Sequence, residues 1–240
     1  MKFISKYHLG TRWRLRLVKS LLSIDKTHSI LDAGCGEGYI SYYLSKKAKV
    51  VGLDISTKLI KENKKLAHKR LSFIALDLNY LSKKFKNRFD KIICLEVLEH
   101  AKNFENIIHN FSKALKKKGI LFATIPIFEG HGHFNYDISY VKRIIEKEGF
   151  KVLKLNYVQM PFFTKSINNL INYFRKMTGY GMKEVDKFDQ TLTFELKKKE
   201  SLFFKVYKII FSLLFLLTYL DIKSYRKGKD FILIKTIKEK

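Results

Sequence analysis

Three glycines and two acidic residues lie at the end of a short, mainly apolar run near the start of the chain, or just after it. Gly34, Gly36 and Gly38 come directly after the apolar run 30–32, and a helix is expected from about residue 39. A glycine-rich turn between a strand and a helix lets a ligand approach the backbone at the carboxyl end of the strand. The spacing therefore predicts a cofactor-binding loop.

The side chains around this loop indicate which kind of cofactor it holds. Asp32 and Glu37 border the glycines, and Tyr39 stands where a dinucleotide fingerprint would have its third glycine. Carboxylates at these positions repel a pyrophosphate and favour a ligand that carries positive charge. We therefore expect a cationic cofactor and not a dinucleotide.

Two further aspartates close the next two predicted strands. Asp54 lies 20 residues beyond Gly34, where a carboxylate can accept hydrogen bonds from ribose hydroxyls. Asp77 can accept a hydrogen bond from the exocyclic amine of adenine. The sequence leaves open that Asp54 caps a helix and that Asp77 is a turn residue, but three strands that each end in aspartate favour a binding site.

An alternation of strands and helices is expected to position these residues. Short apolar runs predict strands at 30–32, 50–54, 72–76, 91–95, 120–125, 151–158 and 230–237. Ser56 and Thr57 stand where a helix that runs through Leu66 should begin, and Gly119 and Gly149 follow the expected ends of two others. This alternation predicts a parallel sheet covered on both faces by helices.

The 240 residues suffice for one buried α/β core with an appendage. We expect a helical N-terminal cap over residues 1–28, the binding core over 29–159, a hydrophobic helical insertion over 160–228, and a final core strand within 229–240.

These motifs together resemble the class I, Rossmann-like methyltransferases that use S-adenosyl-L-methionine (SAM), in particular the group that includes the ubiquinone-pathway O-methyltransferases. The segments ILDAGCGEG, VVGLDIS, ALDL and FDKIICLEVLEH look like the family's successive motifs. The resemblance covers roughly residues 25–160 and 230–240. It implies SAM as the cofactor and a seven-stranded sheet of order 3-2-1-4-5-7-6, with strand 7 antiparallel and helices on both faces.

The resemblance also implies a set of cofactor-binding residues that extends beyond the glycines and aspartates. This set contains Asp32, Gly34, Cys35, Gly36, Gly38, Asp54, Ile55, Asp77, Leu78, Leu95 and Glu96.

Three histidines are candidates for the base that takes a proton from the methyl acceptor. His100 ends the fourth motif, and His131 and His133 follow the fifth strand. Neutral histidine can accept a hydroxyl proton near neutral pH. A helix-initiating contact for His100 and loop-anchoring hydrogen bonds for the other two are equally compatible with the sequence. We identify no third ligand that would make a metal site of His131 and His133.

Oxygen is the favoured acceptor atom because the marks of other chemistries are missing. The Asn- or Asp-Pro-Pro-aromatic motif typical of amino-methylating nucleic-acid enzymes is absent after the fourth strand, where the chain reads LEVL. A nucleophilic cysteine for pyrimidine methylation is also not expected, because Cys35 and Cys94 both fall within apparent core elements.

The insertion and the charge of the chain suggest a membrane surface as a partner. Residues 202–220 are strongly apolar, residues 162–177 are amphipathic, and the formal net charge is +26. A single membrane crossing would separate the seventh strand from the other six, so we expect both segments to lie at an anionic membrane surface and the acceptor to be hydrophobic or lipid-linked. A lid over the site and a dimer interface are the alternatives.

Location and function class follow from the same observations. The N-terminus lacks the apolar core of a signal peptide and the two cysteines predict no disulfide framework, so we expect a cytoplasmic, peripherally membrane-associated protein. The first alternative is a basic RNA-modifying methyltransferase, which the charge permits although no RNA-binding motif stands out. The second is a membrane adaptor that binds SAM without catalysis.

Overall fold

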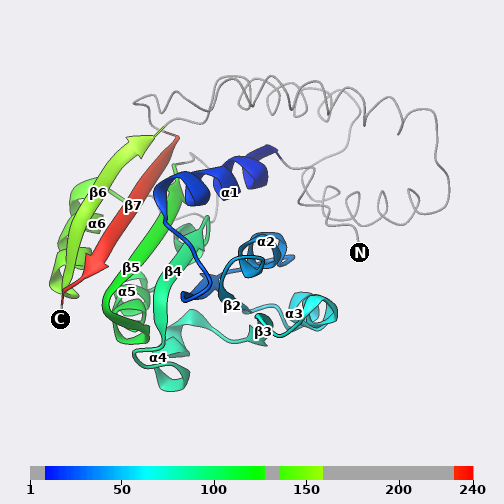
Figure 1. Cartoon of the computed structure of the whole chain (residues 1–240). Coiled ribbons are helices and arrows are strands. Elements are labelled where there is room, and N and C mark those ends of the chain that lie inside the picture. The colour runs from blue at the N-terminus through cyan, green and yellow to red at the C-terminus, as the bar shows by residue number, and fades with distance from the viewer. Residues whose placement is uncertain (1–8, 128–135, 159–229, 240) are drawn as a thin grey trace. The chain divides into compact units, whose positions relative to one another are not determined.

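The computed structural model describes residues 9–127, 136–158 and 230–239 (Figure 1). The chain divides into two compact units, one of residues 14–159 and 227–240 and one of residues 1–13 and 160–226. The first unit contains the whole sheet. The predicted insertion at 160–228 and the loop that carries His131 and His133 lie outside the described residues.

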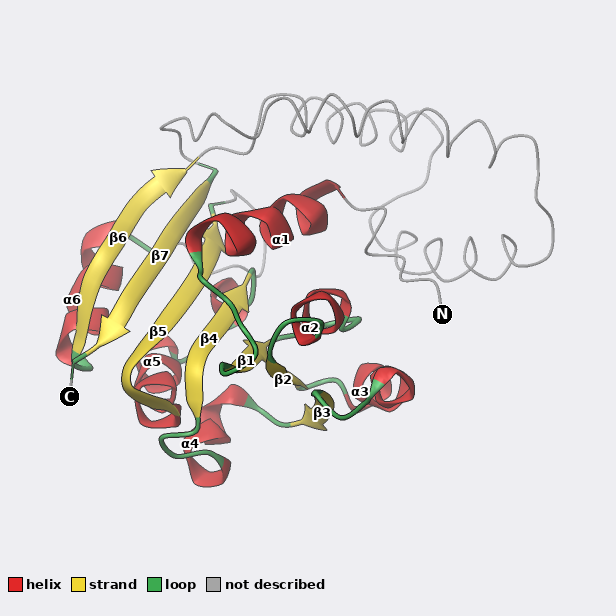
Figure 2. Ribbon diagram, in the orientation of Figure 1, coloured by secondary structure: helices red, strands yellow, loops and turns green. Residues whose placement is uncertain are grey.

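The centre of the first unit is a seven-stranded sheet with the order β3-β2-β1-β4-β5-β7-β6 (Figure 2). The strands β1 to β5 pair in parallel, and β7 runs antiparallel to both of its neighbours. This confirms the predicted strand order. The strands are β1 (Ser29–Ala33), β2 (Lys49–Asp54), β3 (Leu71–Ala75), β4 (Phe89–Leu95), β5 (Leu115–Pro126), β6 (Phe150–Val158) and β7 (Phe231–Lys238).

Helices cover both faces of this sheet (Figure 2). The α-helices are α1 (Leu9–Leu21), α2 (Tyr39–Ser45), α3 (Thr57–Asn63), α4 (Leu81–Lys84), α5 (Phe104–Ala114) and α6 (Ile138–Lys147). Leu81 of α4, Phe111 of α5 and Ile144 of α6 join one core cluster with Ile92 of β4 and Ile234 of β7. The central strands β1 and β4 are buried at all but one position each, which explains why they read as continuous apolar runs.

Two helix ends have the capping residues that the sequence predicts. Ser56 accepts a hydrogen bond from the backbone N–H of Leu59 at the start of α3, and Gly149 has a φ of +81° just after α6. A side-chain cap at the first turn and a left-handed glycine after the last turn satisfy backbone groups that the helix leaves unpaired. The α-helical part of α3 ends at Asn63, and a short 3-10 helix continues it over Lys64–Leu66.

The start of the fifth strand differs from the prediction. We expected a helix to end at residues 116–118 before Gly119, but α5 ends at Ala114 and β5 begins at Leu115. Lys118 has a φ of +61°, and a Cβ on Gly119 would lie 2.8 Å from the carbonyl oxygen of Lys116. The glycine therefore permits a tight bend inside the strand and does not terminate a helix.

Candidate functional site at the carboxyl ends of the parallel strands

The glycine loop leaves β1 in a backbone conformation that requires glycine. Gly34 has a φ of +78°, and a Cβ there would lie 2.2 Å from Cγ2 of Val97. The backbone N–H groups of Gly34 and Cys35 both donate to the carbonyl oxygen of Leu53, at 2.7 and 2.8 Å. The loop is thus fixed against the carboxyl end of β2, which is the edge where a sheet of this type holds its ligand.

Gly36 occupies the open side of this loop. Its φ is +50°, and no atom lies within 4 Å of the place a Cβ would take. Its N–H donates to Oδ2 of Asp54 at 2.9 Å, and its carbonyl oxygen accepts from Nδ2 of Asn63 at 2.6 Å. A ligand can therefore approach a backbone segment that is already held in position from behind.

Asp54 joins the glycine loop to the start of α3. Its Oδ1 accepts a hydrogen bond from the N–H of Ser56 at 2.9 Å, while its Oδ2 binds the N–H of Gly36. Each carboxylate oxygen has a further lone pair that can accept from a hydroxyl. The neighbouring Ile55 is 71% exposed, so an apolar side chain stands in solvent beside this carboxylate, as a surface for a flat ring would require.

Asp32 lies inside the protein, at the base of the loop. It is 3% exposed and accepts a hydrogen bond from the hydroxyl of Ser41 at 2.6 Å. Burial raises the pKa of Asp32 to about 6, against the opposing effect of the Ser41 hydrogen bond. Its predicted contact with the cofactor stays a prediction, but its charge acts from within the core and not from the open side of the loop.

Asp77 forms a turn after β3, and the two leucines of the predicted set are buried. Oδ1 of Asp77 accepts from the backbone N–H and from Nδ2 of Asn79, at 2.8 and 2.9 Å, at the start of the 3-10 helix Leu78–Tyr80. The side chains of Leu78 and Leu95 are buried, at 7% and 9% exposure. The turn role that the sequence left open for Asp77 is therefore present, and it leaves Oδ2 for another donor.

A cation from the N-terminal helix lies at the end of β4. Arg14 of α1 forms an ion pair with Glu96, and Glu96 has a φ of +55°. A bulky residue in this conformation is held by its surroundings; here the N–H of Glu96 donates to the carbonyl oxygen of Thr124 at 3.0 Å. No sequence motif marks Arg14, because only the fold brings the N-terminal helix to this strand end.

A buried carboxylic acid lies beside the one candidate base that the structure describes. Glu99 belongs to the 3-10 helix Leu98–His100, is 2% exposed, and its Oε2 has no hydrogen-bond partner among the described residues. Burial raises the pKa of Glu99 to about 7. The side chain of His100 is 59% exposed, and its Nε2 lies 3.9 Å from Oε1 of Glu99. His100 can therefore meet a ligand in solvent with a carboxyl group behind it.

The cysteines are placed as the sequence predicted. Both are free and buried, and burial raises the thiol pKa of Cys35 and of Cys94 above the ordinary value. Neither is a thiolate near neutral pH, so nucleophilic cysteine chemistry is not supported. Within residues 9–127, 136–158 and 230–239, no group of three or more His, Cys, Asp or Glu side chains could hold a metal ion.

Comparisons with known proteins agree with this geometry. Residues 24–129 match a family described as a methyltransferase domain. The chain is 34% identical over 119 residues to the ubiquinone biosynthesis O-methyltransferase of Coxiella burnetii, which covers 48% of this chain and 50% of that protein. It is 37% identical over 101 residues to the corresponding protein of Pelagibacter ubique, covering 40% and 41% of the two chains.

Residues 24–129 form a methyltransferase domain that is similar to those of class I SAM-dependent methyltransferases. The chain spans about half the length or less of these two relatives. The methyltransferase fold is shared with phosphoethanolamine N-methyltransferase 2 of Haemonchus contortus, solved in complex with SAM, at a TM-score of 0.61 and 15% identity over 95% of this chain and 53% of that one.

The residues of this methyltransferase domain fit its cofactor, SAM. The left-handed glycines leave open space at Gly36, the carboxylate of Asp54 can take ribose hydroxyls, and the exposed Ile55 can pack against adenine. The guanidinium of Arg14 and the carboxylate of Glu96 supply one charge of each sign at the end of β4, which suits the carboxylate and the ammonium of an amino acid.

Proposed function

We propose that this protein transfers the methyl group of SAM to the hydroxyl of a hydrophobic, lipid-linked or membrane-resident acceptor. The observation that carries the proposal is the glycine loop bound to Asp54 and Leu53 at the carboxyl edge of the sheet, in a segment similar to ubiquinone biosynthesis O-methyltransferases. Within this proposal, nucleic acid is possible but less favoured as the methyl acceptor.

The residues at this edge have few chemical tasks. SAM brings a methyl group on a sulfonium that is already activated for in-line displacement, so the protein must align the acceptor and remove its proton. His100 is the described candidate for the proton acceptor, because it is exposed at the end of β4 and has the carboxyl group of Glu99 behind it. His131 and His133 keep their predicted candidacy.

The acceptor class can be identified by following the label from methyl-labelled SAM. Purified protein is incubated in parallel with fractionated membrane lipids, water-soluble metabolites and RNA. We expect label in the lipid fraction, and a His100→Ala variant should incorporate less label at unchanged binding of S-adenosylhomocysteine. Label in RNA alone would support the alternative of an RNA-modifying enzyme.

Cofactor binding separates an enzyme from a non-catalytic adaptor. We expect Asp54→Asn to weaken the binding of S-adenosylhomocysteine roughly 10- to 100-fold, because hydrogen bonds to a charged group contribute about 1.5–3 kcal/mol. Glu62→Gln is the control, since Glu62 pairs with Lys65 on the exposed side of the neighbouring helix. The measurement is a calorimetric titration, and absence of heat for the unaltered protein would contradict both the enzyme and the adaptor.

The membrane part of the proposal rests on residues 160–228, outside the described residues. No helix in the described part of the chain is long and apolar enough to cross a bilayer. We propose that the apolar segment 202–220 lies at the surface of anionic lipid, as its sequence indicates. Vesicle flotation should recover the unaltered protein with the lipid and lose the Phe211→Asp, Leu214→Asp variant. Equal recovery of the two would refute a lipid-bound insertion and favour a lid or a dimer interface.

A further inference from the structure

The opposite edge of the sheet, where the parallel strands begin, carries a cluster of cations that the proposed methyl transfer does not use. Three segments meet there: the turn before β4, the junction of α5 with β5, and the end of β7. We define the amino-edge patch by the basic residues of these segments other than Lys116, which pairs with Asp90; they are Lys86, Arg88, Lys113, Lys117, Lys118 and Lys238. All of them are exposed except Lys238, which is partly buried.

Two backbone hydrogen bonds and the side chain of Lys238 hold these three segments together. The N–H of Asn87 donates to the carbonyl oxygen of Lys113 at 2.9 Å, and the N–H of Arg88 donates to that of Ala114 at 2.8 Å. Nζ of Lys238 donates to the carbonyl oxygen of Leu115 at 2.8 Å and to Oδ1 of Asn87 at 3.3 Å. The backbone that carries the patch is therefore held in one arrangement.

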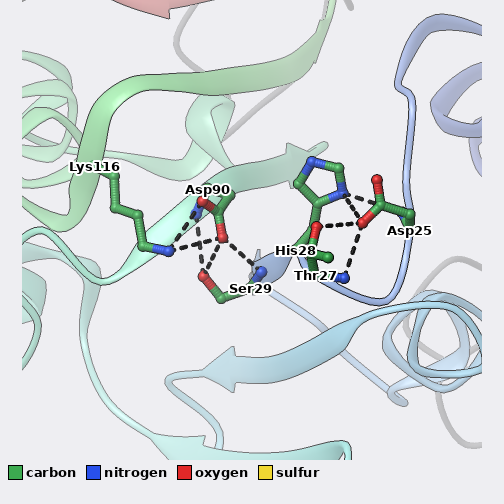
Figure 3. A network of polar contacts seen from close by, with 6 residues as sticks. All are labelled: Asp25, Thr27, His28, Ser29, Asp90 and Lys116. Carbon is green, nitrogen blue, oxygen red and sulfur yellow. Dashed lines mark hydrogen bonds and ion pairs between the residues drawn. The ribbon is translucent and has the colours of Figure 1, made fainter.

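Two of the three carboxylates nearby, those of Asp90 and Asp25, already have partners within the protein (Figure 3). Asp90 accepts from the N–H and hydroxyl of Ser29 at 2.8 and 2.7 Å and forms an ion pair with Lys116 at 3.0 Å. Asp25 accepts from the N–H of Thr27 at 2.9 Å and lies 3.1 Å from Nδ1 of His28. Glu239, next to Lys238, is exposed.

The six cations of the patch therefore have one nearby carboxylate that is not already engaged, that of Glu239. Among the described residues, no ion pair involves Lys86, Arg88, Lys113, Lys117 or Lys118. Desolvation, and then the charge of Lys113, lower the pKa of Lys238. Crowded like charges without a carboxylate partner favour an anion supplied from outside.

We propose that the amino-edge patch binds the phosphate backbone of a nucleic acid, without reading its sequence. One large exposed hydrophobic side chain, that of Leu153 on β6, lies on the strand that pairs with the end of β7, and the other two in the described residues are Ile55 and Tyr80. A protein partner would need an apolar centre in the interface, and base-specific readout of single-stranded RNA would need aromatic side chains for stacking. Phosphate contacts require only positioned cations and backbone donors.

Anionic lipid is the competing partner, and the topology argues against it. The chain leaves β6 at Val158 and enters β7 at Phe231, which pairs with Pro126 at the carboxyl end of β5. The acceptor of the proposed reaction must also be reached at that carboxyl edge. If the acceptor is membrane-resident, as proposed above, a flat membrane would lie at the carboxyl edge. The amino-edge patch would then stay accessible to a polyanion in solution.

The test compares two triple variants of the full chain that change the charge equally. Lys86→Glu, Arg88→Glu, Lys117→Glu reverses half of the patch, and Lys61→Glu, Lys64→Glu, Lys69→Glu reverses three exposed lysines at the far edge of the sheet. Binding to a labelled RNA duplex is followed by fluorescence anisotropy over a series of salt concentrations. Binding of S-adenosylhomocysteine verifies that each variant is folded.

We expect the patch variant to bind the duplex at least tenfold more weakly, with the slope of log affinity against log salt reduced by about 3, or about 1 for each lost phosphate contact. The control variant should keep most of the affinity and slope. Equal loss in both variants would overturn the proposal in favour of non-specific total charge, as would absence of duplex binding. If the patch variant keeps its binding to the duplex but loses binding to anionic vesicles in a flotation assay, the patch would be assigned to lipid. Methyl transfer to a small acceptor should be the same in both variants. Failure of the nucleic-acid proposal is therefore distinguishable from failure of the proposed methyl transfer.

Discussion

Single side chains at the site owe their character to burial as much as to their type. Asp32 and Glu99 are both carboxylic acids inside the domain, and burial raises the pKa of Asp32 to about 6 and that of Glu99 to about 7. Asp90, by contrast, has a pKa of about 2, because hydrogen bonds from Ser29 and Lys116 outweigh the effect of its partial burial. The negative charge of Asp32 at the glycine loop thus lowers the stability of the fold, whereas that of Asp90 at the opposite edge of the sheet raises it.

This difference gives a pH-dependent prediction for Asp32. Its pKa is higher in the folded protein than in the unfolded chain, so the folded state binds more protons between about pH 4 and pH 6, and stability falls as pH rises through that interval. Asp32→Asn removes the titration. We expect the variant to gain stability over the unaltered protein by up to about 3 kcal/mol at about pH 8 and much less at about pH 4. Urea unfolding at the two pH values measures this, and a difference independent of pH would contradict it.

At the scale of elements, the turn from β1 into α2 combines two glycines with different tasks. Gly34 needs room, because a Cβ would meet Val97, whereas Gly36 has open space where a Cβ would be. Both have positive φ, so an alanine at either position costs roughly 1–2 kcal/mol in backbone strain. Only Gly34 adds a steric collision to that cost.

We expect Gly34→Ala to lower the free energy of unfolding by more than Gly36→Ala does. Adding Val97→Ala to Gly34→Ala should recover part of the loss, since it removes the colliding methyl groups. Gly36→Ala should instead weaken S-adenosylhomocysteine binding by more than its small effect on stability explains. Urea unfolding and calorimetry provide the two measurements, and equal stability of the two single variants would show that Val97 moves aside without cost.

At the scale of the whole sheet, β7 connects parts that are distant in sequence. It lies between β5 and β6, and Ile234 pairs with Ala123 on one side and Leu155 on the other. Phe231 to Ile234 form a fully buried run. The stability of the sheet's far half therefore depends on a strand that follows a long insertion.

Shortening a side chain of β7 should lower the free energy of unfolding most where that side chain is buried. We expect Ile234→Ala to lower the free energy of unfolding by about 2–5 kcal/mol, because it leaves a cavity at a site with no exposure. Ile237→Ala, at a partly buried position of the same strand, should cost clearly less. Chemical unfolding of both variants tests this, and similar losses would mean that β7 is not packed as described.

Much of the fold and of the candidate site could be predicted from sequence, where residue type alone marks the position. Gly34 and Asp54 mark strand ends through residue type alone, so the strands and their edge were located correctly. The start of β5 was not, because three consecutive lysines at 116–118 resemble the end of a solvated helix and the bend at Gly119 depends on contacts within the fold. Arg14 and Glu99 were missed for a related reason: pairing and burial arise only after distant segments meet.

The position of β7 also has a consequence for how the chain is made. When residues 115–158 have left the ribosome, β5 and β6 have no strand between them, and the segment that will fill the gap lies about 70 residues further along. Because closing so long a loop costs only modestly more than closing a short one, the delay is tolerable thermodynamically. During that interval, however, β5 presents an unpaired, apolar edge that could pair with another chain. Nascent chains should therefore depend on chaperones until residue 238 has emerged.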